Sequence, residues 1–97
     1  MAQVLAERPA ALFGLGDRKG IIAPGADGDL VLVDPDAERT VTAAAIHSKM
    51  KHSVFQDERL RGWPVLTILR GHVVAEAGAL ASPPMGRFVA RGVLPPI

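Results

Sequence analysis

The chain has 97 residues, of which 48% are hydrophobic and 22% charged, and its net charge is +1. It is long enough for one small domain, but too short for a (β/α)₈ barrel of about 200 residues or more, and too apolar for an intrinsically disordered protein. The interspersed charges and four aromatic residues disfavour nucleic-acid binding, and no apolar run approaches the roughly 18–20 residues of a membrane span.

The chain has no cysteine, which excludes disulfides, thiolate metal sites and cysteine nucleophiles. The N-terminus lacks the basic and apolar regions of a signal peptide. These features are compatible with a reducing cytoplasm, where we expect the protein to act. A domain of this size buries only roughly 60–65% of its chain surface, so we expect marginal stability unless a partner covers more.

Residues 2–15 are predicted to form an amphipathic helix that packs on a sheet, because apolar residues recur at helical spacing. Pro9 should split this helix into two turns or a kinked pair. Gly14 and Gly16 should end it, since glycine readily takes the left-handed conformation of a helix C-cap.

A turn-rich stretch follows, with a type II turn at Pro24-Gly25 and a second turn at Asp27-Gly28. Residues 29–33 are predicted to form a strand covered on both faces, because Leu30, Val31, Leu32 and Val33 are all apolar. Asp34-Pro35-Asp36 should end this strand. Residues 38–41 are predicted to form a further short strand.

Residues 42–51 are predicted to form a helix, because Thr42 can cap the N-terminus and three alanines follow. Residues 53–58 should be a loop.

Residues 59–77 carry the strongest β pattern, with Arg70-Gly71 as a two-residue hairpin link and the hairpin near 65–76. Pro64 should mark a bulge or an edge. The core face should hold Leu66, Ile68, Val73 and Ala75. The predicted cross-strand pairs are Leu69 with His72, Ile68 with Val73, Thr67 with Val74, and Leu66 with Ala75.

The prolines of residues 81–97, at Ser82-Pro83-Pro84 and Pro95-Pro96, predict an extended tail. We expect this tail to be loose or laid across another subunit.

No catalytic, cofactor-binding or metal-binding residue is predicted in this chain. His47, His52 and His72 lack the spacing of a metal site, which normally needs three or four protein ligands. Gly14-Leu15-Gly16 lacks the third glycine and the preceding strand of a dinucleotide fingerprint. Ser48, Ser53 and Ser82 lack the strained Gly-x-Ser-x-Gly elbow of a catalytic serine. Asp27, Asp29, Asp34 and Asp36 each lie beside a turn residue, so a structural role in turns is expected for them.

An ordered set of short motifs nevertheless resembles the C-terminal part of the cyclic amidases of the amidohydrolase superfamily: hydantoinase or dihydropyrimidinase, dihydroorotase and allantoinase. The resemblance covers residues 4–91, and Gly62-Trp63-Pro64-Val65 favours hydantoinase-like members. Residues 53–58 depart from the usual hydantoinase loop. The other motifs are Pro9-Ala10-Ala11-Leu12-Phe13-Gly14-Leu15, residues 19–31 (KGIIAPGADGDLV), Asp34-Pro35, Arg70-Gly71-His72-Val73-Val74 and Gly86-Arg87-Phe88.

The resemblance implies an enzyme built from a metal-dependent barrel, with zinc or similar divalent metals, and a small β-sandwich assembled from both chain ends. It places all metal ligands upstream of the matched region, so none carries over to this chain. The expected fold is mainly β with an N-terminal helix: residues 1–16 as the last barrel-type helix, 17–80 as half of the β-sandwich, and 81–97 as the tail.

Three functions stay open at this stage. The leading hypothesis is a non-catalytic structural or oligomerisation segment of a cyclic-amide hydrolase, as a truncated gene product or an isolated domain. The second is a subunit that completes a hydrolase in trans on a separate barrel chain, and the third is a small-ligand binding β module. Because half a sandwich exposes strand edges and an apolar face, we expect homo-oligomers or association with a barrel chain.

Overall fold

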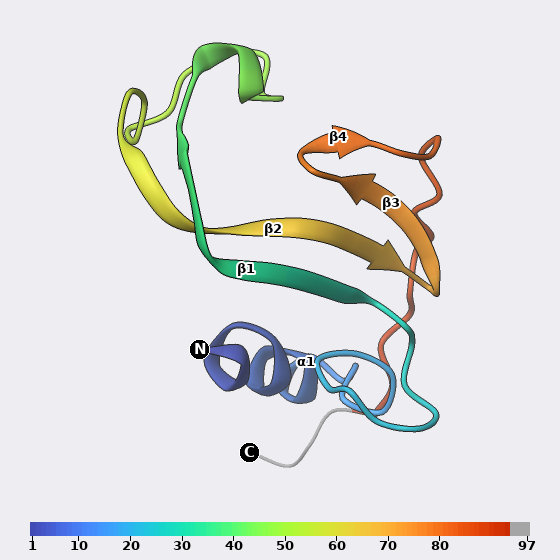
Figure 1. The fold of residues 1–97 in the computed structure, drawn as a ribbon. Coiled ribbons are helices and arrows are strands. Elements are labelled where there is room, and N and C mark those ends of the chain that lie inside the picture. The colour runs from blue at the N-terminus through green and yellow to red at the C-terminus, as the bar shows by residue number, and fades with distance from the viewer. Residues whose placement is uncertain (94–97) are drawn as a thin grey trace.

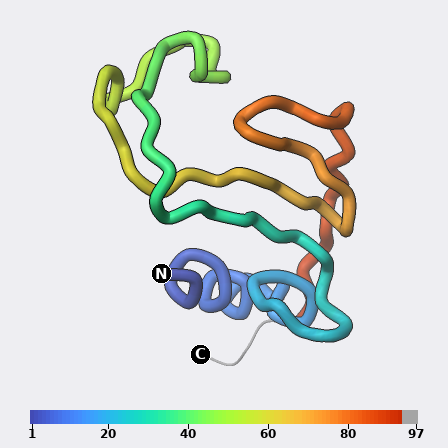
Figure 2. The backbone as a smooth tube through the Cα atoms, viewed as in Figure 1, coloured from blue at the N-terminus to red at the C-terminus, as the bar shows by residue number. Residues whose placement is uncertain are grey.

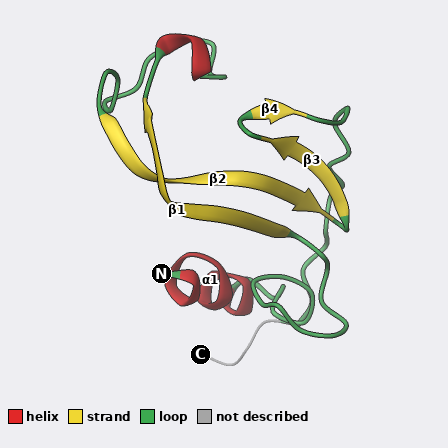
Figure 3. Ribbon diagram, viewed as in Figure 1, coloured by secondary structure: helices red, strands yellow, loops and turns green. Residues whose placement is uncertain are grey.

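The computed structural model describes residues 1–93, which form a helical N-terminus and one four-stranded antiparallel sheet (Figures 1 and 3). The strands follow one another in the sheet in their sequence order. This confirms the expected fold class, mainly β with an N-terminal helix and, in the part of the chain described, no barrel. The strands are β1 (Leu30–Thr40), β2 (Arg59–Leu69), β3 (His72–Glu76) and β4 (Ala79–Leu80).

The N-terminal helix is continuous through Pro9, so the predicted split or kink is wrong. A π-helical segment, Gln3–Glu7, passes directly into α1, Arg8–Leu12, and Pro9 lies in the first turn of α1. Just before Pro9 the Arg8 N–H donates to Gln3 O, five residues back, so the wider π-helical turn carries the chain into the residue that has no N–H. The predicted stop at Gly14 is confirmed: its φ is +76°, and Leu15 N–H donates to Ala10 O at 2.7 Å, as in a Schellman motif.

The helix rests on the loop that follows it, rather than packing closely on the sheet as predicted. Gly20 has a φ of +86°, and a Cβ atom built on it would lie 2.7 Å from Ala6 O and 2.8 Å from Ala10 Cβ. A cavity of about 540 Å³ separates the small side chains of the helix from Leu30 and Val31 at the start of β1. Close contact with the loop therefore positions the helix below β1 (Figure 1).

Strand β1 runs through Asp34-Pro35-Asp36, where we expected it to end. The pairing with β2 shifts between Asp34 and Glu38, so Pro35 lies where the ladder is interrupted and its missing N–H is not needed. The prediction that both faces of this strand are covered is also wrong for this chain, since Val31, Leu32 and Val33 are 47–57% exposed. The type II turn before β1 is confirmed by a Gly25 φ of +90° and an Ala26 N–H to Ala23 O bond of 3.1 Å.

The predicted helix over residues 42–51 is wrong. Only Ala43–Ala45 form a single 3₁₀ turn, and the Thr42 side chain makes no capping hydrogen bond. An isolated helix of this length is unstable in water without tertiary packing. Residues 53–58 form the turn-rich loop that was predicted.

The β2–β3 hairpin is confirmed, with Arg70 and Gly71 in the left-handed conformations of a type I′ turn. The pairs Leu69–His72 and Ile68–Val73 are also as predicted. Beyond them a bulge on β3 places Thr67 opposite Ala75 and Leu66 opposite Glu76, so the predicted pairs and the predicted place of Ala75 on the core face are wrong. Pro64 flanks a second irregularity, as expected, because Val33 pairs with Pro64 while Leu32 pairs with Leu66.

The described part of the tail contacts its own chain, so it is not loose as one of the two alternatives had it. The other alternative, a tail laid across another subunit, stays a prediction. After the short strand β4, which the sequence analysis missed, residues 83–93 have no regular structure. They run past the hairpin turn to the N-terminal helix (Figure 2), where Gly92 N–H donates to Gly14 O at 2.6 Å. The predicted extended segment at Pro95-Pro96 lies outside the described residues.

The molecule has almost no interior of its own. Within residues 1–93, Ala10 is the only apolar residue classed as buried. The accessible surface is 7851 Å², whereas a compact monomer of 10.2 kDa exposes about 5,300 Å². The radius of gyration of 15.8 Å likewise exceeds the about 12.5 Å of a compact domain of this length.

Candidate functional site

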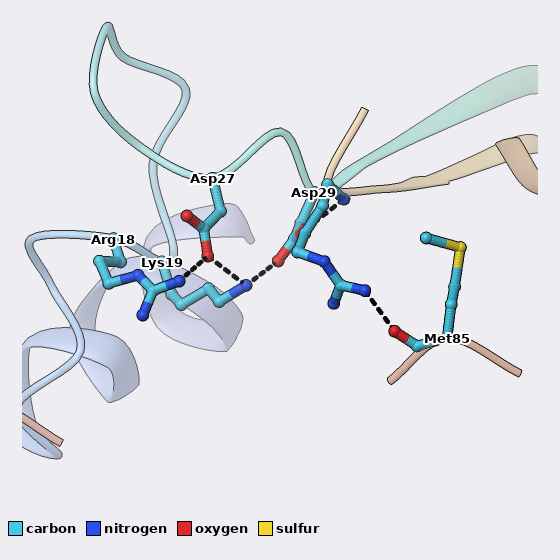
Figure 4. Close-up of polar contacts among 6 residues, drawn as sticks. Arg18, Lys19, Asp27, Asp29 and Met85 are labelled. Atoms are coloured by element: carbon cyan, nitrogen blue, oxygen red, sulfur yellow. Dashed lines mark hydrogen bonds and ion pairs between the residues drawn. The ribbon is translucent and has the colours of Figure 1, made fainter. Parts of the chain in front are cut away.

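The most organised polar site is a group of five charged residues that we call the ionic cluster: Arg18, Lys19, Asp27, Asp29 and Arg70 (Figure 4). Four of them flank the turn-rich loop between the helix and β1. The fifth, Arg70, lies in the turn between β2 and β3. The cluster therefore joins segments that are distant in sequence at one end of the sheet.

Both acidic side chains of the cluster are held by cations. Arg18 Nη2 lies 3.0 Å and Lys19 Nζ 2.8 Å from Asp27 Oδ2, and Lys19 also pairs with Asp29. Asp29 Oδ1 accepts the backbone N–H of Arg70 at 2.9 Å. The Arg70 guanidinium in turn donates to the carbonyl of Met85, which fixes the start of the tail.

These contacts favour the charged form of each titrating group. The hydrogen bonds from Lys19 lower the pKa of Asp27 and, together with the Arg70 N–H, that of Asp29. The hydrogen bonds to Asp27 and Asp29 raise the pKa of Lys19. At neutral pH the aspartates are thus firmly ionised acceptors, which suits structural anchoring and makes proton donation by them unfavourable.

The other aspartates and the serines of the sequence analysis lie in turns or surface pairs. Asp34 Oδ1 accepts the N–H of Asp36 at 2.9 Å, and Asp36 pairs with Arg61 at 2.7 Å. Ser53 Oγ accepts the N–H of Phe55, and Ser82 Oγ donates to Pro83 O. The Ser48 carbonyl accepts the N–H of Lys51 at 3.2 Å, and the Ser48 hydroxyl has no hydrogen bond to another of residues 1–93.

The histidines do not form a site together. His72 opens β3, and His47 and His52 lie in the loop region between β1 and β2. Over residues 1–93, no group of three or more His, Cys, Asp and Glu residues is arranged to hold a metal ion. No helix in the described part of the chain meets the length and apolarity that crossing a bilayer requires.

Sequence reasoning missed the basic half of the cluster, Arg18, Lys19 and Arg70. The aspartates stood out because each is beside a turn glycine or proline. Their basic partners lie eight or more positions away and follow no local pattern, so only the folded loop brings them together.

A second feature is the uncovered apolar surface of the helix and β1. Val4, Leu5, Leu12 and Phe13 are 62–70% exposed, and Ile22 in the following loop is 90% exposed. Exposed apolar residues grouped on one element, rather than scattered singly, are typical of interaction surfaces.

The comparisons with known proteins point to one family. A family model described as "Amidohydrolase family" matches residues 1–75. Curated relatives include a D-hydantoinase from Ralstonia pickettii, 38% identical over 92% of this chain, and an L-hydantoinase from Paenarthrobacter aurescens, 41% identical over 94%. A dihydropyrimidinase from Rattus norvegicus is 38% identical over 91%.

Solved structures of hydantoinases also superpose on this chain. An L-hydantoinase from Arthrobacter aurescens superposes with a TM-score of 0.79 at 41% identity, over 84% of this chain and 18% of its own. A D-hydantoinase structure gives 0.76 at 38% identity, over 81% of this chain and 17% of its own. The chain spans only about a fifth of the length of the relatives it matches, 20% of the Ralstonia enzyme and 17% of the rat enzyme.

Proposed function

Because the chain belongs to the amidohydrolase family, we propose that it is a non-catalytic structural segment of a cyclic-amide hydrolase that packs against a barrel formed by the rest of such an enzyme. The observation that carries this proposal is the uncovered apolar surface. A folded segment with one buried apolar residue among those described needs additional contacts to be stable.

The amount of uncovered surface supports a permanent association. The chain exposes about 2,500 Å² more than a compact monomer of its mass. Stable complexes of standard size bury about 800 Å² per partner, whereas permanent interfaces are larger and more apolar. The surplus and its apolar character both match the permanent class.

For the whole enzyme we propose hydrolysis of a C–N bond in a cyclic amide, in keeping with the hydantoinase and dihydropyrimidinase relatives. The family implies a divalent metal, but the described residues do not fit one. The two best-placed carboxylates, Asp27 and Asp29, are already paired with Arg18 and Lys19. We therefore assign the metal and the chemistry to parts of the enzyme outside this chain. A cytoplasmic location remains a prediction from composition.

The open edge of β1 and its exposed valines and leucine support a second proposal for the chain by itself. An uncapped, apolar edge strand favours pairing with another copy. We expect homo-oligomers in sedimentation experiments, with a mass that falls on dilution. A well-folded monomer that persists at high concentration would contradict this expectation.

A chimera tests the structural role. The segment of the Paenarthrobacter L-hydantoinase that matches this chain is replaced by residues 1–93, and hydantoin hydrolysis is measured in the soluble fraction. We expect an active chimera, and no turnover by the 97-residue chain alone when supplied with zinc or manganese.

Matched variants make the test specific. Phe13→Asp places a charge on the exposed helix surface, so it should strongly reduce the amount of soluble, active chimera. Val54→Asp changes a residue that is 82% exposed in the loop after β1 and should be tolerated. Equal yields of the two variants, or turnover by the isolated chain, would contradict the proposal. The same chimera split into two chains tests whether the segment also acts in trans.

A further inference from the structure

A cavity of about 520 Å³ lies beside the ionic cluster, at the end of the sheet where the tail crosses the hairpin turn. This volume is within the range of small-molecule sites. One wall comes from the loop after the helix, one from the hairpin turn and one from the tail. Its lining residues are Leu15, Arg18, Lys19, Leu69, Arg70, Gly86, Arg87, Phe88 and Val89.

All the charged side chains that line this cavity are positive. Four cationic side chains line the cavity, and no carboxylate does. The two nearby acids, Asp27 and Asp29, bind Arg18 and Lys19 from outside the lining, which leaves a surplus of two positive charges. Within residues 1–93, no hydrogen bond or ion pair is recorded for the Arg87 side chain.

The cationic side chains of the cavity keep N–H donors that their contacts within the chain do not use. An arginine carries five N–H donors and a lysine three. Arg70 uses its guanidinium for Met85 O, and Arg18 for Asp27. The pKa of Lys19 is raised by its contacts with Asp27 and Asp29, so its ammonium stays charged at neutral pH.

We propose that this cavity is a binding site for a small organic carboxylate that carries an apolar group. The planar fork of an arginine matches a carboxylate through two parallel hydrogen bonds. Leu15, Leu69 and Phe88 offer apolar surface beside these donors, so an apolar substituent gains contacts that an inorganic anion lacks. The proposal goes beyond the structural role, since it concerns residues of this chain only.

Phenylacetate is a suitable probe, and phenylacetamide is its neutral control of the same shape. Each is titrated into the isotopically labelled chain while backbone amide shifts are followed by NMR. We expect saturable shifts from phenylacetate at Leu69, Arg87 and Phe88, weakened by added salt, and no saturable shift from phenylacetamide.

Two arginine variants complete the experiment. Arg87→Gln should weaken phenylacetate binding about fivefold or more, because it removes a charge-assisted donor that has no described partner to lose. Arg8→Gln removes an exposed arginine of the helix that does not line the cavity, and should leave the affinity unchanged. Equal binding of the amide, equal loss in both variants, or no saturable shift would overturn the proposal. An unfolded hairpin would do so too, since the cavity exists only where hairpin and tail meet.

Discussion

The two ends of the β1–β2 ribbon are both rich in charge but differ in what their charges connect. At the near end, the ionic cluster links the loop before β1, the hairpin turn and the tail. At the far end, Arg59 pairs with Glu38 and Arg61 with Asp36 across two neighbouring strands, with side chains 40–78% exposed. The side chains of the near-end acids are only 18–31% exposed.

This difference shows that the number of ion pairs is a poor guide to their importance. Exposed pairs between adjacent strands contribute little, since solvent and salt screen them and the strands are already paired. Pairs that are partly shielded and that join segments distant in sequence constrain the fold itself. The near end should therefore control stability, while the far end, a two-stranded ribbon, should tolerate change.

The largest effect is expected at Gly20, which holds the near-end loop against the helix. Gly20→Ala should lower the free energy of unfolding by about 3 kcal/mol, because it combines a left-handed backbone with overlap on Ala6 O and Ala10 Cβ. Gly25→Ala is the matched control: its φ is +90° and the space around it is open, so we expect a loss of about 1 kcal/mol. Urea unfolding at one fixed protein concentration measures the free energy of unfolding of both variants. Equal losses in the two variants would refute the close packing at Gly20.

An intermediate effect is expected from Asp29→Asn. Asparagine can still accept the Arg70 N–H but loses the charge that pairs with Lys19, so the free energy of unfolding should fall by about 1 kcal/mol. Asp36→Asn at the far end should change it by at most about 0.3 kcal/mol. If the two substitutions had equal effects in the same urea experiment, the contrast between the ends would be lost.

The smallest effect is a change in pH dependence. The folded-state pKa values of Asp27 and Asp29 lie below their ordinary 3.8, so their contribution is present above that pH and is lost as the pH falls through the folded values. The pKa of Lys19 lies above its ordinary 10.5, so its contribution is present below that pH and is lost as the pH rises through the folded value. Urea midpoints of the native chain should therefore drop more steeply in acid than those of Asp29→Asn. Parallel acid profiles would contradict this.

The sequence predicted those parts of the fold that local chemistry determines. Arg70-Gly71 is a turn signal that needs no distant partner, and it correctly placed β2 and β3. Gly14 and Pro24-Gly25 likewise marked a helix end and a turn. The family resemblance was also confirmed, because it rests on an ordered set of such turn and stop residues.

What could not be predicted depends on contacts between distant segments. The bulge at Val74 changes the cross-strand pairs although nothing local marks it. Pro35 predicted the end of a strand, but the β1–β2 pairing is interrupted at this position, so the strand continues although proline has no N–H to donate. The alanines after Thr42 favour a helix only if something packs on it. The ionic cluster has the same origin, since Asp29 and Arg70 meet only after the sheet has formed.

The bond between Gly92 and Gly14 has a consequence for folding during synthesis. It joins residues near opposite ends of the described chain, so it adds to the contact order and cannot form until the tail has been made. Since protein synthesis adds about 5–20 residues per second, the contact can form only several seconds after the helix has been synthesised. During that interval the end of the helix lacks its bond to the tail, and slower synthesis of the tail lengthens this period.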